Sequence, residues 1–313
     1  YLFYIYKLVM DLKLLTWNIN FINNSWLKRV KCINTLIDKK EDYHVIALQE
    51  VTIPFDENMT KIYGFINNMK YKTDTFVTRN VIYKNLANYF PQNKINIIAA
   101  FKYLMDKLFI FLSYIMSNFG NTLIDIYTNN GILGKIFGGV LVFGFPFVFI
   151  SMWLFIGMMT LVNKELKPTI NNSVIGIGRI IQYSEFKFNN RDVLFINVHL
   201  SYKKNDEKVK ENEISELLDF IKKNEKDIVI LAGDFNCKPT SIVYKTLKEN
   251  NYKSVMLEKH GKELNTFPSD KPIKCLDYIW IKGDKITIKE ANIIGDEKYT
   301  DHLGIESTIT INK

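Results

Sequence analysis

Residues 228–236 read Ile-Val-Ile-Leu-Ala-Gly-Asp-Phe-Asn, an apolar run that ends in the tetrad Gly-Asp-Phe-Asn at 233–236. The run Ile228 to Leu231 has the length and the β-branched content of a buried strand, so the tetrad stands where that strand ends. A strand end on a rigid sheet holds polar side chains in fixed positions, which catalysis requires. The stretch therefore predicts a sheet that presents a carboxylate and an amide at one of its ends.

Further runs place polar residues beside apolar ones in the same manner. They are Thr16-Trp17-Asn18 after Leu12 to Leu15, Gln49-Glu50 after Val45 to Leu48, Asn197-Val198-His199-Leu200 after Val193 to Ile196, Leu276-Asp277-Tyr278-Ile279-Trp280, and Thr300-Asp301-His302. Taken singly, a pair such as Gln49-Glu50 is typical of a solvated strand end, and Asp301-His302 of a surface or capping feature. The order of all these runs together indicates one composite site, assembled from segments far apart in the chain.

The runs, in this order, resemble the endonuclease/exonuclease/phosphatase superfamily, which includes DNase I-like nucleases, abasic-site endonucleases, inositol-polyphosphate phosphatases and neutral sphingomyelinases. The stretch Thr-Phe-Pro-Ser-Asp-Lys-Pro at 266–272, leading into Asp277, is similar to the small metal-dependent hydrolases of that superfamily. The resemblance covers 11–90 and 165–312. It implies an α+β fold, a four-layer α/β/β/α sandwich of two mixed sheets, formed by a discontinuous catalytic domain over 11–312.

The remaining pattern mixes helices and strands, with no internal repeat. Ser25 is a suitable cap for a helix over 26–37, the apolar residues of 212–223 share one helix face, and Ser241 is suited to cap a further helix. We expect other strands, and a turn at Asn189-Asn190, within the following ranges: 174–181, 186–188, 193–198, 279–281, 286–288 and 305–309.

The resemblance implies a metal ion bound by oxygen ligands. Hydrolysis of a phosphate ester requires neutralisation of an anionic transition state, and hard carboxylate oxygens suit Mg²⁺ (or Mn²⁺) for that purpose. Glu50 is the implied principal ligand, with Asn18 and Asp301 completing or positioning the metal site. The implied cofactor is therefore Mg²⁺ or Mn²⁺.

The resemblance also assigns catalytic roles. Asp234 would orient or deprotonate the attacking water, and Asn236 would hold a phosphate oxygen or fix Asp234. His302 would stabilise charge on the phosphoryl group, while Asp277 accepts its other N–H and sets its tautomer. His199 is the candidate general acid or second transition-state donor. It stands where abasic endonucleases carry an aromatic residue, which favours the phosphodiesterase, phosphatase and sphingomyelinase-like branches.

A hydrophobic insertion at 91–164 interrupts the resemblance. Ile136 to Val162 contains no charged residue and is about 27 residues long, more than the roughly 20 that span a bilayer. The segment 95–118 is apolar with a few charges, and is equally suited to crossing a membrane or lying on it. Because predicted catalytic residues lie on both sides of the insertion, it has to return to the compartment that it left. We therefore expect a membrane hairpin through 95–162; a re-entrant segment broken at Gly144-Phe145-Pro146 and a soluble oligomerisation element are the alternatives.

Bulk composition bounds the partners and the compartment. The 313 residues carry 41 Lys and Arg against 33 Asp and Glu, a net charge of +8, which favours anionic partners or reflects a Lys-rich soluble surface. The cysteines, Cys32, Cys237 and Cys275, are odd in number and have no CxxC spacing, which argues against disulfides and zinc. A reducing compartment follows, so we expect membrane localisation with the catalytic domain facing the cytoplasm.

The sequence therefore predicts a membrane-anchored, Mg²⁺-dependent phosphoesterase. The expected substrate is a phosphodiester or phosphomonoester, such as a lipid headgroup hydrolysed by a sphingomyelinase-like or phosphoinositide phosphatase-like activity. One alternative is a membrane-tethered endonuclease or exonuclease acting on nucleic acid. An alternative of another class is a catalytically silent membrane scaffold.

Overall fold

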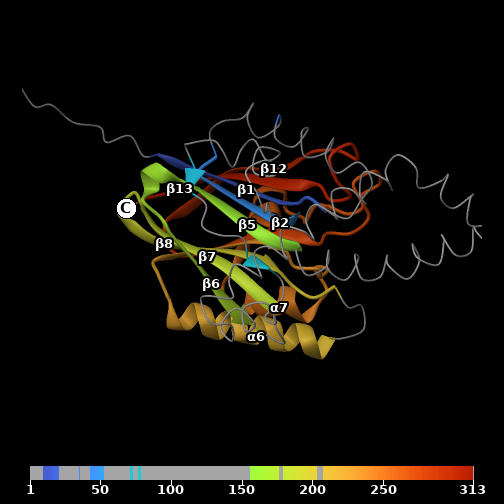
Figure 1. Cartoon of the computed structure of the whole chain (residues 1–313), viewed down its shortest axis with the longest axis horizontal. Helices are drawn as coiled ribbons and strands as arrows, with labels where there is room; N and C mark the ends of the chain where they lie inside the picture. The colour runs from blue at the N-terminus through green and yellow to red at the C-terminus, as the bar shows by residue number, and fades with distance from the viewer. Residues whose placement is uncertain are drawn as a thin grey trace, which may run out of the picture.

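Two mixed β-sheets pack face to face in the computed structural model of the chain (Figure 1). The first sheet has the order β12 (Ile286–Ile294), β13 (Gly304–Ile311), β1 (Asp11–Asn18), β2 (Val45–Thr52), β5 (Ile156–Asn163) and β3 (Tyr71–Lys72), with β4 (Val77–Thr78) also paired to β5. The second sheet has the order β10 (Lys253–Ser254), β11 (Asp277–Lys282), β9 (Ile228–Asp234), β8 (Arg191–His199), β7 (Arg179–Phe188) and β6 (Thr169–Ile175). The structure describes residues 10–20, 35, 43–52, 71–72, 77–78, 156–175, 179–202 and 207–312.

The alternation of side chains along each strand divides the apolar residues between two layers of core. Leu12 and Leu14 of β1 face the second sheet, whereas Leu15 and Trp17 pack on the outer face of the first. All seven residues of β9 are buried, because helices cover the outer face of its sheet. A strand buried on both faces is apolar without interruption, which explains the run at 228–232.

Helices α6 (Glu207–Lys223) and α7 (Ile242–Glu249) lie against the outer face of the second sheet (Figure 1). The predicted helix at 212–223 is confirmed and begins five residues earlier than expected. The predicted cap is also confirmed, since Ser241 Oγ accepts a hydrogen bond from the backbone N–H of Tyr244 at 3.2 Å. A short helix, α8 (Val255–His260), follows β10. The predicted helix over 26–37 lies outside the described residues, apart from Thr35.

The turn at Asn189-Asn190 is confirmed, with φ values of 49° and 66°, the left-handed pair that a tight hairpin requires. The single strand expected at 174–181 is wrong. β6 ends at Ile175 and β7 begins at Arg179, and these two residues pair antiparallel. Apolar β-branched residues stand on both sides of the reversal, so hydrophobicity alone does not reveal it.

The insertion predicted at 91–164 ends earlier than the sequence suggested. Residues 156–163 form β5, an interior strand of the first sheet that pairs antiparallel with β2 from Val45↔Val162 to Thr52↔Ile156. The prediction that 136–162 crosses a membrane is therefore wrong for 156–162, and the catalytic domain resumes at Ile156. A strand interior to a packed sheet and a membrane segment are both apolar throughout, which explains the error.

The remainder of that insertion, 91–155, lies outside the described residues. None of the helices in the described part of the chain combines the length and the apolar character needed to cross a membrane.

Gly233 provides a test of the strand pairing. Its φ is +150°, and a methyl group on it would overlap the carbonyl oxygen of Val198 on the neighbouring strand β8. We expect Gly233→Ala to lower the free energy of unfolding by about 3 kcal/mol, measured by urea denaturation. Gly261→Ala is the control, because φ there is +69° but no atom lies within 4 Å, so about 1 kcal/mol is expected. Equal losses in the two variants would contradict the close approach.

Candidate active site

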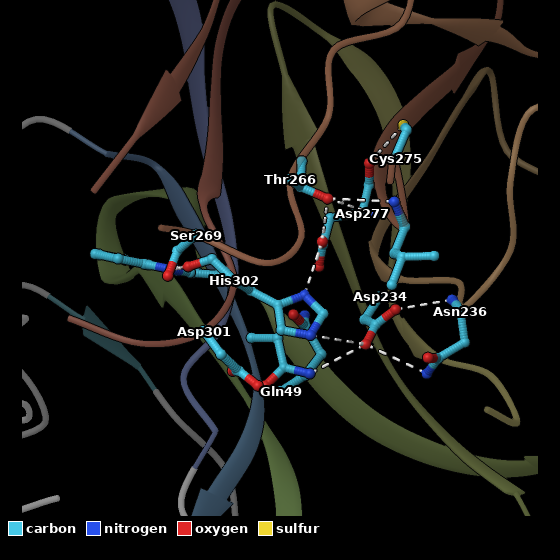
Figure 2. Close-up of polar contacts among 12 residues, drawn as sticks. Gln49, Asp234, Asn236, Thr266, Ser269, Cys275, Asp277, Asp301 and His302 are labelled. Atoms are coloured by element: carbon cyan, nitrogen blue, oxygen red, sulfur yellow. Dashed lines mark hydrogen bonds and ion pairs between the residues drawn. The ribbon is translucent and has the colours of Figure 1, made fainter. Parts of the chain in front are cut away.

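The predicted catalytic residues meet at one end of the sandwich. β1 runs parallel to β2, and β8 runs parallel to β9, so each pair ends together. Asn18 at the end of β1 hydrogen-bonds Asp234 at the end of β9, which shows that the ends of the two sheets coincide. β11 runs antiparallel to β9 and begins here, with Asp277 opposite Asp234. Figure 2 shows the carboxylates of Asp277 and Asp234 on two sides of the His302 ring.

Asp234 lies at the centre of the site and is buried. Its Oδ1 accepts the backbone N–H of Asn236 at 2.7 Å, and its Oδ2 accepts the Asn18 side-chain amide at 3.0 Å. Asn236 has a φ of 50°, a left-handed conformation that turns its own amide back toward the Asp234 carboxylate, 3.3 Å away. Asn236 therefore holds Asp234, which is one of the two roles predicted for it, and Asn18, predicted for the metal site, binds the same carboxylate.

Glu50 owes its direction to a bulge in β2. The pairing of β2 with β5 shifts register between Gln49 and Val51, and Glu50 has a φ of 52°. Leu48 and Val51 both pack on the outer face of the sheet, so the extra residue keeps Glu50 on the side of the site. Its carboxylate accepts the Asn18 amide at 3.2 Å and remains 21% exposed.

His302 is held by a chain of buried polar groups. Its Nδ1 lies 2.9 Å from Asp277 Oδ2, which also accepts a 2.6 Å hydrogen bond from the Thr266 hydroxyl. The Phe267 ring packs against the imidazole with centroids 4.8 Å apart. The Trp17 indole N–H donates to the His302 carbonyl at 3.0 Å, which ties the loop to β1. The predicted Asp277–His302 pair is thus present and supported on several sides.

His199 and Asp301 differ in how they join the site. His199 is buried at the end of β8, with Nε2 3.7 Å from both Glu50 Oε1 and Asp234 Oδ2. Asp301 accepts a 3.2 Å hydrogen bond from the Thr300 hydroxyl. No contact that joins Asp301 to Glu50 or Asn18 is found within the described part of the chain.

The electrostatics divide the site into a cationic and an anionic half. Burial lowers the pKa of His302, but the carboxylates of Asp277, Asp234 and Asp301 outweigh it and raise that pKa to about 10. Burial and the neighbouring Asp277 raise the pKa of Asp234 to about 7, although His302 opposes the shift. His302 is therefore an imidazolium at neutral pH. Asp234 gains and loses a proton near neutral pH.

Two groups of residues bear on metal binding. Asp234, Asp277 and His302 have ligand atoms within 4.8 Å of one another. However, the His302 ring is protonated and engaged with Asp277, so it is a poor ligand. Glu50 has an accessible carboxylate, a hard oxygen donor that fits Mg²⁺ or Mn²⁺. The Asn18 side chain turns its NH2 toward Glu50, and its Oδ1 accepts the Asn20 backbone N–H. Burial, and next the Asp277 carboxylate, raise the pKa of Asp234, and a divalent cation nearby would favour its ionised form.

Two residues of α6 support the site and were not predicted. Glu213, 1% exposed, accepts hydrogen bonds from the Ser201 backbone N–H at 2.9 Å and hydroxyl at 2.5 Å, and lies 3.5 Å from Arg179 Nε. Lys210, one turn earlier, donates to the Asn236 carbonyl at 2.6 Å. One helix thus holds the loop after His199 and the loop after Asp234. In the sequence, Glu213 lies among the apolar residues of one face of α6, and this position could have indicated its supporting role.

Comparison with known proteins agrees with this geometry. Residues 15–302 match the Endonuclease/Exonuclease/phosphatase family. The chain belongs to this family. Members of the family are hydrolases that act on phosphoester bonds, so the predicted superfamily is confirmed. No curated protein matches the chain.

Solved structures share the fold of this family member at low sequence identity. An endonuclease/exonuclease/phosphatase from Bacteroides vulgatus has a TM-score of 0.60 and 13% identity, covering 97% of this chain and 100% of that one. The human Nocturnin catalytic domain with bound sulfate anion has a TM-score of 0.58 and 16% identity, covering 96% and 95%. D. rerio TDP2 complexed with single strand DNA product has a TM-score of 0.58 and 15% identity, covering 96% and 99%.

The Asp277–His302 pair predicts a pH-dependent property. Because the folded pKa of His302 exceeds its ordinary value of about 6.5, its contribution to stability is complete below that pH. The contribution is lost as the pH rises through about 10. We expect Asp277→Asn to lower the pKa of His302 from about 10, because the nearest carboxylate and its hydrogen bond to the ring are removed. NMR titration of the imidazole nitrogens measures this change. Asp270→Asn, at an exposed position, is the control, and an unchanged His302 titration in Asp277→Asn would contradict the assignment.

The α6 contacts predict a second, structural effect. Glu213→Ala leaves the buried Ser201 and Arg179 groups without their shared carboxylate, so we expect the free energy of unfolding to fall by about 3 kcal/mol. Glu211→Ala, at an exposed position on the same helix, is expected to change it by less than about 0.5 kcal/mol. Urea denaturation measures both variants. Indistinguishable urea midpoints for the two variants would show that the Glu213 contacts do not stabilise the fold.

Proposed function

We propose that this family member is a Mg²⁺- or Mn²⁺-dependent phosphoesterase held at a membrane, where it hydrolyses a phosphate ester of a lipid headgroup. The phosphoesterase proposal rests on one observation. The Asn18 amide donates hydrogen bonds to the carboxylates of both Glu50 and Asp234, and the protonated His302 ring lies beside Asp234. This arrangement offers an anionic half for a cation and a water, and a cationic half for a phosphoryl group.

Asp234 would activate the attacking water. Its carboxylate is fixed by the Asn236 backbone N–H and the Asn18 amide, which leaves it a single orientation. Burial and Asp277 raise its pKa to about 7, so the carboxylate is a stronger base than an ordinary aspartate and is still partly ionised at neutral pH. Positioning and proton acceptance would therefore come from one group.

The two histidines would act on the phosphoryl oxygens. The Nε2 of His302 lies 3.9 Å from Asp234 Oδ2 and points into the same space, where an imidazolium N–H can donate to a developing negative charge. His199 Nε2 lies between Glu50 and Asp234, where it can protonate the leaving oxygen. Asp277 would act through His302 by holding its Nδ1–H.

Glu50 would hold the metal ion, with Asn18 and Asp301 helping to complete or position the site; when bound, the ion supplies charge neutralisation at the phosphate.

The catalytic domain would face the cytoplasm. Two buried cysteines, Cys237 and Cys275, support this placement, because they are free thiols.

The membrane and lipid part of the proposal rests on the sequence before β5. With 156–163 assigned to the sheet, 136–155 still contains no charged residue and has about the 20 residues that span hydrocarbon. The competing substrate is nucleic acid, because TDP2, a structural neighbour, is described with a single-stranded DNA product. A silent scaffold is disfavoured, since the catalytic residues contact one another as hydrolysis requires.

Glu50→Gln tests the metal-dependent chemistry. We expect it to reduce Mg²⁺-dependent turnover by at least about a hundredfold, because a neutral amide binds the cation poorly. The detergent-solubilised chain would be assayed on sphingomyelin, phosphoinositides, plasmid DNA and a generic bis-phosphodiester, with and without chelator. Glu258→Gln, at an exposed position, is the matched control.

The substrate panel separates the alternatives. Turnover of plasmid DNA without turnover of any lipid would replace the lipid proposal by the nuclease alternative. Chelator-resistant turnover, or full activity of Glu50→Gln, would contradict the metal assignment. Folded protein that hydrolyses none of these esters would favour the scaffold.

A further inference from the structure

Both ends of the segment 79–155 join the fold at the active-site end of the first sheet. β5 starts at Ile156, paired with Thr52, so its start flanks the bulge that carries Glu50. β4 pairs with the same stretch of β5, with Thr78 opposite Gly157. Neighbouring strands lie about 5 Å apart, so the chain leaves and re-enters the domain at adjacent points.

The sequence that enters β5 is continuous with the uncharged stretch 136–155. No polar linker separates Phe155 from the strand, and β5 passes directly beside Glu50. Because a strand rises only about 3.3 Å per residue, an uncharged stretch buried in hydrocarbon would place the lipid headgroups close to the active site.

The exposed hydrophobic side chains of the described surface provide a second observation about the active-site end. The exposed large hydrophobic side chains among the described residues are Met10, Tyr202 and Ile273, at 55%, 57% and 63% exposure. Tyr202 follows His199 by three residues. Ile273 belongs to the hairpin in which Phe267 pairs with Lys274 and packs against His302. Only Met10 lies at the opposite end of the sandwich, where β1 begins.

We propose that the active-site end of the sandwich is a membrane-facing surface, with Tyr202 and Ile273 in the headgroup region. The substrate is then a phosphoester presented by the bilayer itself, reached without extraction into water. Tyrosine suits this position, because its ring enters the interface while its hydroxyl stays hydrated. The substrate part rests on the proposed function, whereas the orientation is independent of catalysis.

Site-directed fluorescence tests the orientation on the full chain. In a Cys32→Ser background, Tyr202→Cys, Ile273→Cys and Met10→Cys would each be labelled with an environment-sensitive dye and reconstituted in phosphatidylcholine vesicles containing phosphatidylserine. Cys237 and Cys275 are buried, and burial raises the pKa of both thiols, so they react slowly. We expect lipid-borne spin labels to quench the dyes at 202 and 273 and to leave the dye at 10 unquenched.

Opposite results would overturn the orientation. Equal quenching at position 10, or dyes at 202 and 273 that only aqueous iodide quenches, would show that this end does not face lipid. Failure of the chain to enter vesicles would overturn it as well.

A kinetic comparison tests the consequence for the substrate. The double variant Tyr202→Ser with Ile273→Ser is expected to lower the ratio of vesicle-borne to monomeric substrate turnover about tenfold, because two apolar anchors are lost. Met10→Ser is the control, with an unchanged ratio. An unchanged ratio in the double variant would overturn the interfacial role of these residues. Absence of hydrolysis on every ester would sink the proposed function, while the fluorescence result would still decide the orientation.

Discussion

The side-chain amides of Gln49 on β2 and Asn197 on β8 hydrogen-bond across the two sheets at 2.8 Å, in full burial. Asn197 also donates to the Leu48 and Met159 carbonyls, so it is bonded to two strands of the opposite sheet. A buried amide that loses its partner costs about 1 to 3 kcal/mol, so sliding of the sheets is opposed. Glu50 follows Gln49 directly and His199 lies two residues after Asn197. The bridge therefore fixes the distance between the ends of β2 and β8, which carry Glu50 and His199.

The catalytic groups are then held from behind by further buried polar contacts. Thr266 and Asp277 hold His302 on one side, and Lys210 and Glu213 of α6 hold the loops after Asp234 and His199 on the other. Each of these contacts satisfies a group that burial would otherwise penalise. Burial raises the pKa of Asp234, whereas the surrounding carboxylates, led by Asp277, raise the pKa of His302 against the effect of burial. Support and reactivity thus come from one desolvated network.

β5 connects this catalytic end with the apolar segment that precedes it. Its pairing with β2 makes the strand part of the core, and its first residue stands beside the Glu50 bulge. A sequence inserted before Ile156 therefore joins the domain beside Glu50, at the candidate site. The chain itself therefore links the insertion directly to the candidate site, through β5.

The sequence by itself predicted most of the longer strands, the helices α6 and α7, and the residues that meet at the candidate site. The β9 run and the Gly-Asp-Phe-Asn tetrad at 233–236 encode a buried strand and its polar end locally, in composition and period. Tertiary structure decided the bulge at Glu50, the amide bridge, the α6 contacts and the place of β5. The Asn18–Asp234 hydrogen bond joins residues 216 positions apart, and no local pattern specifies such a partner. The apolar run through 136–162 shows the limit most clearly, because a sheet interior and a bilayer both exclude water and both select the same residues.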